Sequence, residues 1–202
     1  MGVQVRFTPP PSLAVMPCRF AAHKSDAAEW CEGRSWIWRA PVLLYLAWVG
    51  FHHVKDPTYA SLFGGITLGV HELGHLLLFW AGRFLSIAGG SLAQVAAPAA
   101  AAWVLYRQRD YFGVAVAAAW LAFSLFGLAA YIADARAQEL PLVGLTPDPV
   151  HDWHWLLEKF GILEWDGRLA LLTRAVAFVI WLGSLALGGW LVWTMAAKRS
   201  DH

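Results

Sequence analysis

The sequence has few charged residues. Asp, Glu, Lys and Arg make up only 14% of its 202 residues, whereas a soluble domain averages about a quarter. Apolar residues account for 58% of the chain. Too few polar side chains remain to cover a water-facing globule. The composition therefore predicts an integral membrane protein, with membrane lipid as its main partner.

Net positive charge is also lacking, because the formal net charge is only +1. This excludes nucleic-acid binding that depends on bulk positive charge. Cysteine is scarce, and the two cysteines, Cys18 and Cys31, are not at a spacing that suits joint metal ligation. Residues 1–35 do not show the order of regions of a signal peptide. We interpret them as a flexible or interfacial segment before a membrane domain at residues 36–202.

Five apolar segments approach the roughly 20 residues that a helix needs to cross the bilayer core. Such long runs favour helices over strands, because a helix satisfies its own backbone hydrogen bonds in lipid. The sequence therefore predicts an all-α polytopic protein with about five transmembrane helices, located in the bacterial inner membrane. The predicted helices cover residues 36–54, 59–80, 90–106, 111–132 and 169–196.

One long connection, residues 133–168, separates the last two predicted helices. Loops of this length are usually functional or disordered. Within it, the pattern of residues 151–157 predicts a short amphipathic helix on or in the membrane. In the third predicted helix, the polar residue Gln94 is expected to hydrogen-bond a ligand or a substrate backbone, or to join two helices.

The second predicted helix carries the motif His71-Glu72-Leu73-Gly74-His75. Four residues advance about 400° along a helix, so the rings of His71 and His75 point within about 40° of each other. Both rings could hold one zinc ion at about 2.0–2.1 Å. Glu72 would act as the catalytic general base on a zinc-activated water. Ionisable groups within a spanning helix are usually functional, which favours this interpretation.

A catalytic zinc ion usually has three protein ligands and one water molecule. The third ligand must come from another segment, and we expect His151 first and Asp134 second. Asp152 and Asp166 are the remaining alternatives. A carboxylate that does not bind zinc could instead orient a metal ligand.

Around this motif the chain resembles the intramembrane zinc metalloproteases of the site-2 protease class, and within it a set of small bacterial membrane proteins. The resemblance implies a zinc site and peptide-bond hydrolysis within the membrane. Site-2 proteases supply their third ligand from an Asn-x-x-Pro-x-x-x-Leu-Asp-Gly segment, which this chain lacks; Trp165-Asp166-Gly167 is its nearest match. The resembling residues are 56–59, 71–75, 89–91, Gln94, Pro98, 131–136 and 151–153.

Together these features predict a membrane-embedded zinc metallopeptidase, a hydrolase that cleaves membrane-associated polypeptides with Glu72 as the base. The alternative is a membrane zinc protein without hydrolytic activity, such as a metal carrier, sensor or assembly factor. Such a protein would have four protein ligands and no open position on the metal.

Overall fold

The computed structural model describes residues 26–142 and 150–200, and this part of the chain is helical, without strands. The all-α prediction is confirmed for these residues, and each of the five predicted helices is present. Of the predicted N-terminal segment, residues 1–25 lie outside the described residues. The helices are α2 (Arg39–Lys55), α3 (Leu62–Leu77), α4 (Arg83–Arg107), α5 (Tyr111–Ala133), α6 (Asp152–Lys159) and α7 (Asp166–Ser200), with the 3₁₀ turns η1 (Phe79–Ala81) and η2 (Leu163–Trp165).

Three of the helices are long and apolar enough to cross a membrane: α4, α5 and the η2–α7 segment Leu163–Lys198. α2 and α3 have 17 and 16 residues, fewer than the roughly 20 that a span needs. Large apolar side chains on α7 are exposed, including Leu171 and Val179. Such exposure fits a lipid environment for α7. Of the five predicted transmembrane helices, three are thus candidate spans in the part of the chain that the structure describes.

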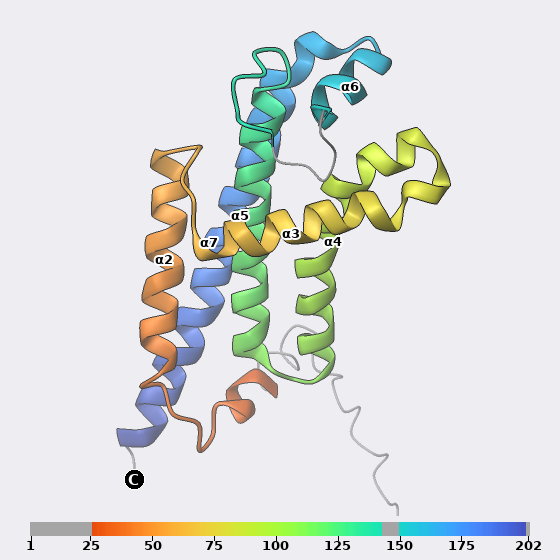
Figure 1. Cartoon of the computed structure of the whole chain (residues 1–202). Helices are drawn as coiled ribbons and strands as arrows, with labels where there is room; N and C mark the ends of the chain where they lie inside the picture. The colour runs from red at the N-terminus through yellow and green to blue at the C-terminus, as the bar shows by residue number, and fades with distance from the viewer. Residues whose placement is uncertain (1–25, 143–149, 201–202) are drawn as a thin grey trace, which may run out of the picture.

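α5 is the central helix of the bundle, and α2 and α7 run alongside it (Figure 1). Phe126 of α5, Leu46 of α2 and Trp181 of α7 are buried in one core cluster. Small residues allow the close packing: a Cβ on Gly50 would lie 2.1 Å from Nε1 of Trp181. α5 is therefore more deeply buried than the other two candidate spans, with 56% of its apolar window inside the protein.

α3, the helix with the His-Glu motif, lies across α4 and α5 instead of alongside them (Figure 1). Its contact with α4 is close, because a Cβ on Gly74 would lie only 2.2 Å from the carbonyl oxygen of Gly89. Only glycine at these two positions lets the backbones approach in this way. The crossing brings the motif against α4 and beside α6.

The long connection between α5 and α7 contains α6, which confirms the short helix predicted there. Trp153 of α6 donates a hydrogen bond from Nε1 to Oγ of Ser91 on α4, at 3.1 Å. Arg136, just after α5, forms a 2.7 Å ion pair with Asp166 at the start of α7. These contacts fix α6 over the end of the bundle that holds the motif (Figure 1).

Candidate metal centre

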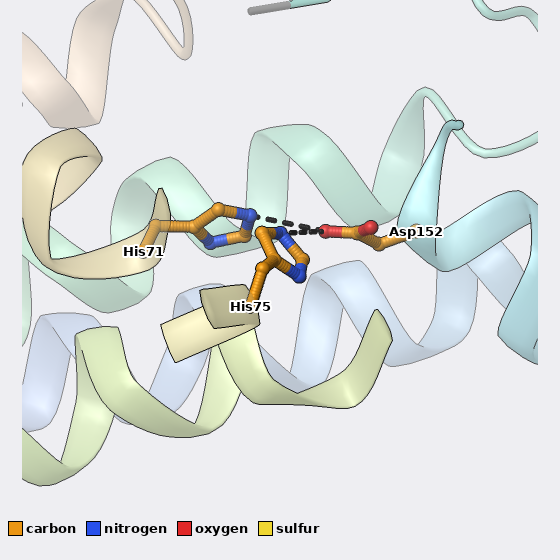
Figure 2. Close-up of side chains that lie close together, drawn as sticks. All are labelled: His71, His75 and Asp152. Atoms are coloured by element: carbon orange, nitrogen blue, oxygen red, sulfur yellow. Dashed lines mark hydrogen bonds and ion pairs between the residues drawn. The ribbon is translucent and has the colours of Figure 1, made fainter. Parts of the chain in front are cut away.

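Three side chains from two helices converge beside α4. Oδ2 of Asp152 on α6 lies 3.0 Å from Nε2 of His71 and 3.2 Å from Nε2 of His75 on α3 (Figure 2). Each residue offers one ligand atom, and the three atoms lie within 4.8 Å of one another. Among the described residues, this is the group of His, Cys, Asp and Glu side chains that could hold a metal ion.

The other nitrogen of each histidine ring has its own acceptor. His71 Nδ1 lies 2.7 Å from Oε1 of Gln94, and His75 Nδ1 lies 2.8 Å from the carbonyl oxygen of Ser86. Both acceptors require the proton to be on Nδ1. Each Nε2 is therefore the nitrogen that faces Asp152, and in a neutral ring it would offer its lone pair to a metal ion.

The donor set fits a metal ion. Two ligand atoms at about 2.05 Å from a tetrahedral zinc ion are about 3.3 Å apart, close to both nitrogen–oxygen distances found here. Burial alone would raise the pKa of Asp152, but its contacts with His71 and His75 outweigh burial and hold the pKa below its ordinary value. Asp152 is thus an ionised carboxylate facing two imidazole nitrogens, the arrangement that a divalent cation stabilises.

Gly90 of α4 forms the wall behind the two histidines. A Cβ at this position would lie 2.5 Å from Nε2 of His71 and 2.5 Å from Nε2 of His75. Any residue larger than glycine would therefore block the Nε2 atoms of His71 and His75. Gly90 is therefore needed to leave room for the two histidine rings, whereas the helix itself would accept a larger residue at this position.

The group opens onto a cavity of 570 Å³. Glu72 lines this cavity with the two histidines and Asp152, and its carboxylate makes no hydrogen bond or ion pair with a described residue. The structure thus places the predicted base Glu72 beside two of the predicted ligands, His71 and His75, with its carboxylate oxygens available to a bound molecule.

Tyr131 of α5 lines the same cavity, and its hydroxyl oxygen accepts a hydrogen bond from the backbone N–H of Asp152, at 3.0 Å. Because the oxygen is the acceptor there, the hydroxyl proton remains available for a ligand in the cavity. The Tyr131 ring also packs against His151, with centroids 4.3 Å apart. Tyr131 therefore both positions α6 and presents a donor to the site.

His151 and Asp134, the first choices for the third ligand, lie apart from the pair of motif histidines and bind each other. His151 Nδ1 accepts the N–H of His154, so its proton is on Nε2, which lies 3.3 Å from Oδ2 of Asp134. Burial lowers the pKa of His151 and keeps this ring neutral, although Asp134 opposes the shift. Neither ring nitrogen has a lone pair left for a metal ion.

Asp134 is likewise fully engaged. Its Oδ1 accepts the N–H of Glu139 at 2.9 Å and its Oδ2 accepts that of Leu140 at 3.1 Å. Asp134 thereby caps the end of α5 and orders the chain that follows. Asp134 and His151, at the N-terminus of α6, together hold Asp152 in place. The sequence analysis considered this orienting role for a carboxylate that does not bind the metal ion itself.

Asp166, the remaining alternative, also lies apart from the histidines. Its Oδ2 pairs with Arg136 and its Oδ1 accepts the N–H of Gly167, at 2.7 Å. The structure thus brings together His71, His75, Glu72 and Asp152, and leaves the other candidates in supporting contacts.

A comparison with protein-family models, curated proteins and solved structures finds no match.

Three residues at the site were missed by the sequence analysis as site residues: Ser86, Gly90 and Tyr131. Ser86 contributes a backbone carbonyl, which any residue could supply, so no side-chain pattern marks it. Gly90 and Tyr131 lie in stretches covered by the family resemblance, and nothing else in the sequence marked them as site residues. Gln94 was singled out because it is polar within an apolar helix, and its predicted hydrogen bond is confirmed.

Proposed function

We propose that this protein is a membrane-embedded metallopeptidase with one zinc ion on His71, His75 and Asp152. The observation that carries the proposal is the convergence of three ligand atoms in a cavity shared with Glu72. Two histidines and one carboxylate leave a fourth position open, which is the pattern of catalytic zinc sites. Zinc bound there would supply Lewis acidity and lower the pKa of water toward about 7.

Glu72 and Tyr131 have separate roles in this reaction. Glu72 takes a proton from the attacking water and passes it to the leaving amine, which its unpaired carboxylate in the cavity permits. Tyr131 donates a hydrogen bond from its hydroxyl group to the substrate carbonyl oxygen as negative charge develops on that oxygen, and it keeps its proton. Gln94 and Ser86 keep the two histidine rings in the orientation that presents Nε2.

The shape of the cavity favours a polypeptide substrate. One face of α3 lines it, including Gly64, Thr67, Leu68, His75 and Leu76. Gly64 and His75 are separated by about 17 Å along the helix, the length of about five residues of extended chain. Most of the other lining side chains are apolar, as an apolar segment of a membrane-associated polypeptide requires.

The non-hydrolytic alternative requires a closed metal site with four protein ligands. The described residues supply three, and Glu72 is not among the converging ligand atoms. An open position beside an unpaired carboxylate favours hydrolysis over metal storage or transfer.

The test uses the full chain purified in detergent, with zinc measured by metal analysis and cleavage measured on an apolar fluorogenic peptide. Wild type should hold one zinc ion and cleave the peptide. Glu72→Gln should keep zinc and lose at least about a hundredfold in rate. Glu158→Gln, on the exposed face of α6, is the matched control and should keep both.

Wild-type cleavage by Glu72→Gln would overturn the role of the base. A wild-type protein that binds zinc but cleaves no peptide would favour the carrier or sensor alternative. Failure of the wild type to bind zinc would overturn the metal centre itself.

A further inference from the structure

A second cavity, of 610 Å³, lies at the end of the bundle opposite α6, where α2 begins and where α4 turns into α5 (Figure 1). The polar residues in its wall are at the helix ends: Arg34 and Arg39 before and at the start of α2, Gln108 after α4, and Asp110 before α5. The apolar lining residues lie one to three turns further in. They include Val42, Leu105, Val116 and Trp120.

Arg39 is the central polar group of this wall. It is only 6% exposed, and its buried Nε has no hydrogen-bond partner. Nη1 donates to the carbonyl oxygen of Ser35, and the guanidinium carbon lies 4.0 Å from the centroid of the Trp38 ring. Within the described part of the chain, Arg39 forms no ion pair with a carboxylate. A buried charge without a direct ion pair is costly, and Asp110 in the same wall offsets only part of that cost, so Arg39 favours an anionic ligand.

The helix ends around Arg39 also favour an anion. α2 begins at Arg39, has no acidic residue in its first turn and has no side-chain cap. A cation at a helix N-terminus opposes the helix dipole, and an anion there would compensate both charges. α5 likewise presents its N-terminus to the cavity through Phe112 and Gly113. Both helix N-termini thus face the same cavity, although the carboxylate of Asp110 already caps that of α5.

The charges of the cavity wall are two arginines against one aspartate. Asp110 is engaged locally, because its Oδ1 accepts the N–H of Gly113 at 3.0 Å as the cap of α5. The wall thus keeps one net positive charge, which complements a ligand with net negative charge. Exposed Trp36 and Trp38 flank this end of the bundle, as aromatic side chains do at a membrane interface.

We propose that this cavity binds an anionic phospholipid, with its phosphate at Arg39 and Arg34 and one acyl chain along α2, α4 and α5. The phosphate accepts hydrogen bonds from the guanidinium groups, for which arginine geometry is well suited. Inorganic phosphate shares this chemistry but leaves the apolar depth of the cavity empty. The combination of a cationic mouth and an apolar interior selects the lipid. This site is independent of the metal centre.

The experiment uses the full chain, delipidated in detergent, with bound lipid counted by native mass spectrometry. The probes are phosphatidylglycerol, phosphatidylcholine with the same acyl chains, and inorganic phosphate. The variants are Arg39→Gln and Arg34→Gln. Arg107→Gln is the control, because Arg107 lies at the same end of the bundle and contacts Trp103 without lining the cavity. Circular dichroism checks that each variant is helical.

Wild type should bind phosphatidylglycerol about tenfold more tightly than phosphatidylcholine. Both lipids carry the phosphate, but the choline cation of phosphatidylcholine would meet the net positive charge of the cavity wall. Arg39→Gln should abolish this preference, and Arg107→Gln should retain it. Equal affinity for the two lipids, or an unchanged preference in Arg39→Gln, would overturn the proposal. If inorganic phosphate binds as tightly as phosphatidylglycerol, the cavity is a site for a free anion, and the proposal of a lipid ligand is overturned.

If Arg39→Gln does not fold, Arg34→Gln decides the question, because Arg34 is exposed and its loss leaves the packed core intact. The expected loss of preference for phosphatidylglycerol is then about threefold, the value of an exposed charge contact. No loss in Arg34→Gln would equally contradict the proposal.

Discussion

His71 on α3 and Gln94 on α4 form a 2.7 Å hydrogen bond between Nδ1 and Oε1. Gln94 in turn donates from Nε2 to the carbonyl oxygen of Ser124 on α5, at 3.2 Å. The amide therefore has one orientation, in which only its oxygen faces the histidine. This chain of contacts joins three helices and sets which ring nitrogen of His71 points at Asp152.

Gln94→Leu should weaken zinc binding by about ten- to a hundredfold, because the ring of His71 loses the acceptor that fixes its tautomer and orientation. Competition with a zinc chelator measures the affinity. Gln108→Leu, beyond the other end of α4, should bind zinc as the wild type does. An unchanged zinc affinity in Gln94→Leu would show that the hydrogen bond does not support the ligand.

Gly90→Ala should abolish zinc binding while the chain stays helical, because the added methyl group would lie 2.5 Å from both Nε2 atoms. The same metal titration, together with circular dichroism, measures both effects. Gly69→Ala on α3 provides the comparison, since a Cβ there meets nothing within 4 Å. Zinc retained at full occupancy in Gly90→Ala would mean that the metal lies elsewhere.

Asp152→Ala should lose zinc as completely as His75→Ala does, because each removes one of three ligands. Asp134→Asn should keep zinc with an affinity lowered about tenfold, since Asp134 acts by holding His151 and the start of α6. Isothermal titration of the three variants ranks them directly. The reverse ranking, with Asp134→Asn losing zinc and Asp152→Ala keeping it, would make Asp134 the ligand.

Tyr131→Phe should lower kcat by about a hundredfold with KM and zinc content nearly unchanged, because the hydroxyl acts on the developing charge of the transition state. Steady-state kinetics on the apolar peptide provides both constants. Tyr106→Phe is the control, because Tyr106 on α4 does not line the cavity. An effect on KM alone would assign Tyr131 to substrate binding.

Much of the fold could be predicted from the sequence, because a long continuous apolar run favours a helix, which satisfies its own backbone hydrogen bonds. The predicted limits differ most for α4, which begins at Arg83 instead of Gly90 and continues through Pro98. Residues 83–89 extend the start of α4, and Gly89 at the end of this stretch packs against Gly74 of α3. Local sequence patterns do not contain that contact. Nor could they show that α3 lies across its neighbours, which depends on the close approach of Gly74 and Gly89.

The pairing of His71 and His75 was determined by the sequence, since their spacing places both rings on one face of any helix. The position of Glu72 beside them follows from the same geometry. The third residue of the group could not be chosen from the sequence. His151 is the N-cap of α6, with extended backbone, and Asp152 is the first residue of the helix, so no helical spacing fixes the direction of either side chain. Only the docking of α6, held by Asp134, Tyr131 and Ser91, turns Asp152 toward the histidines and His151 away from them. Tertiary contacts between segments distant in the sequence decided that choice, and no pattern within either segment encodes them.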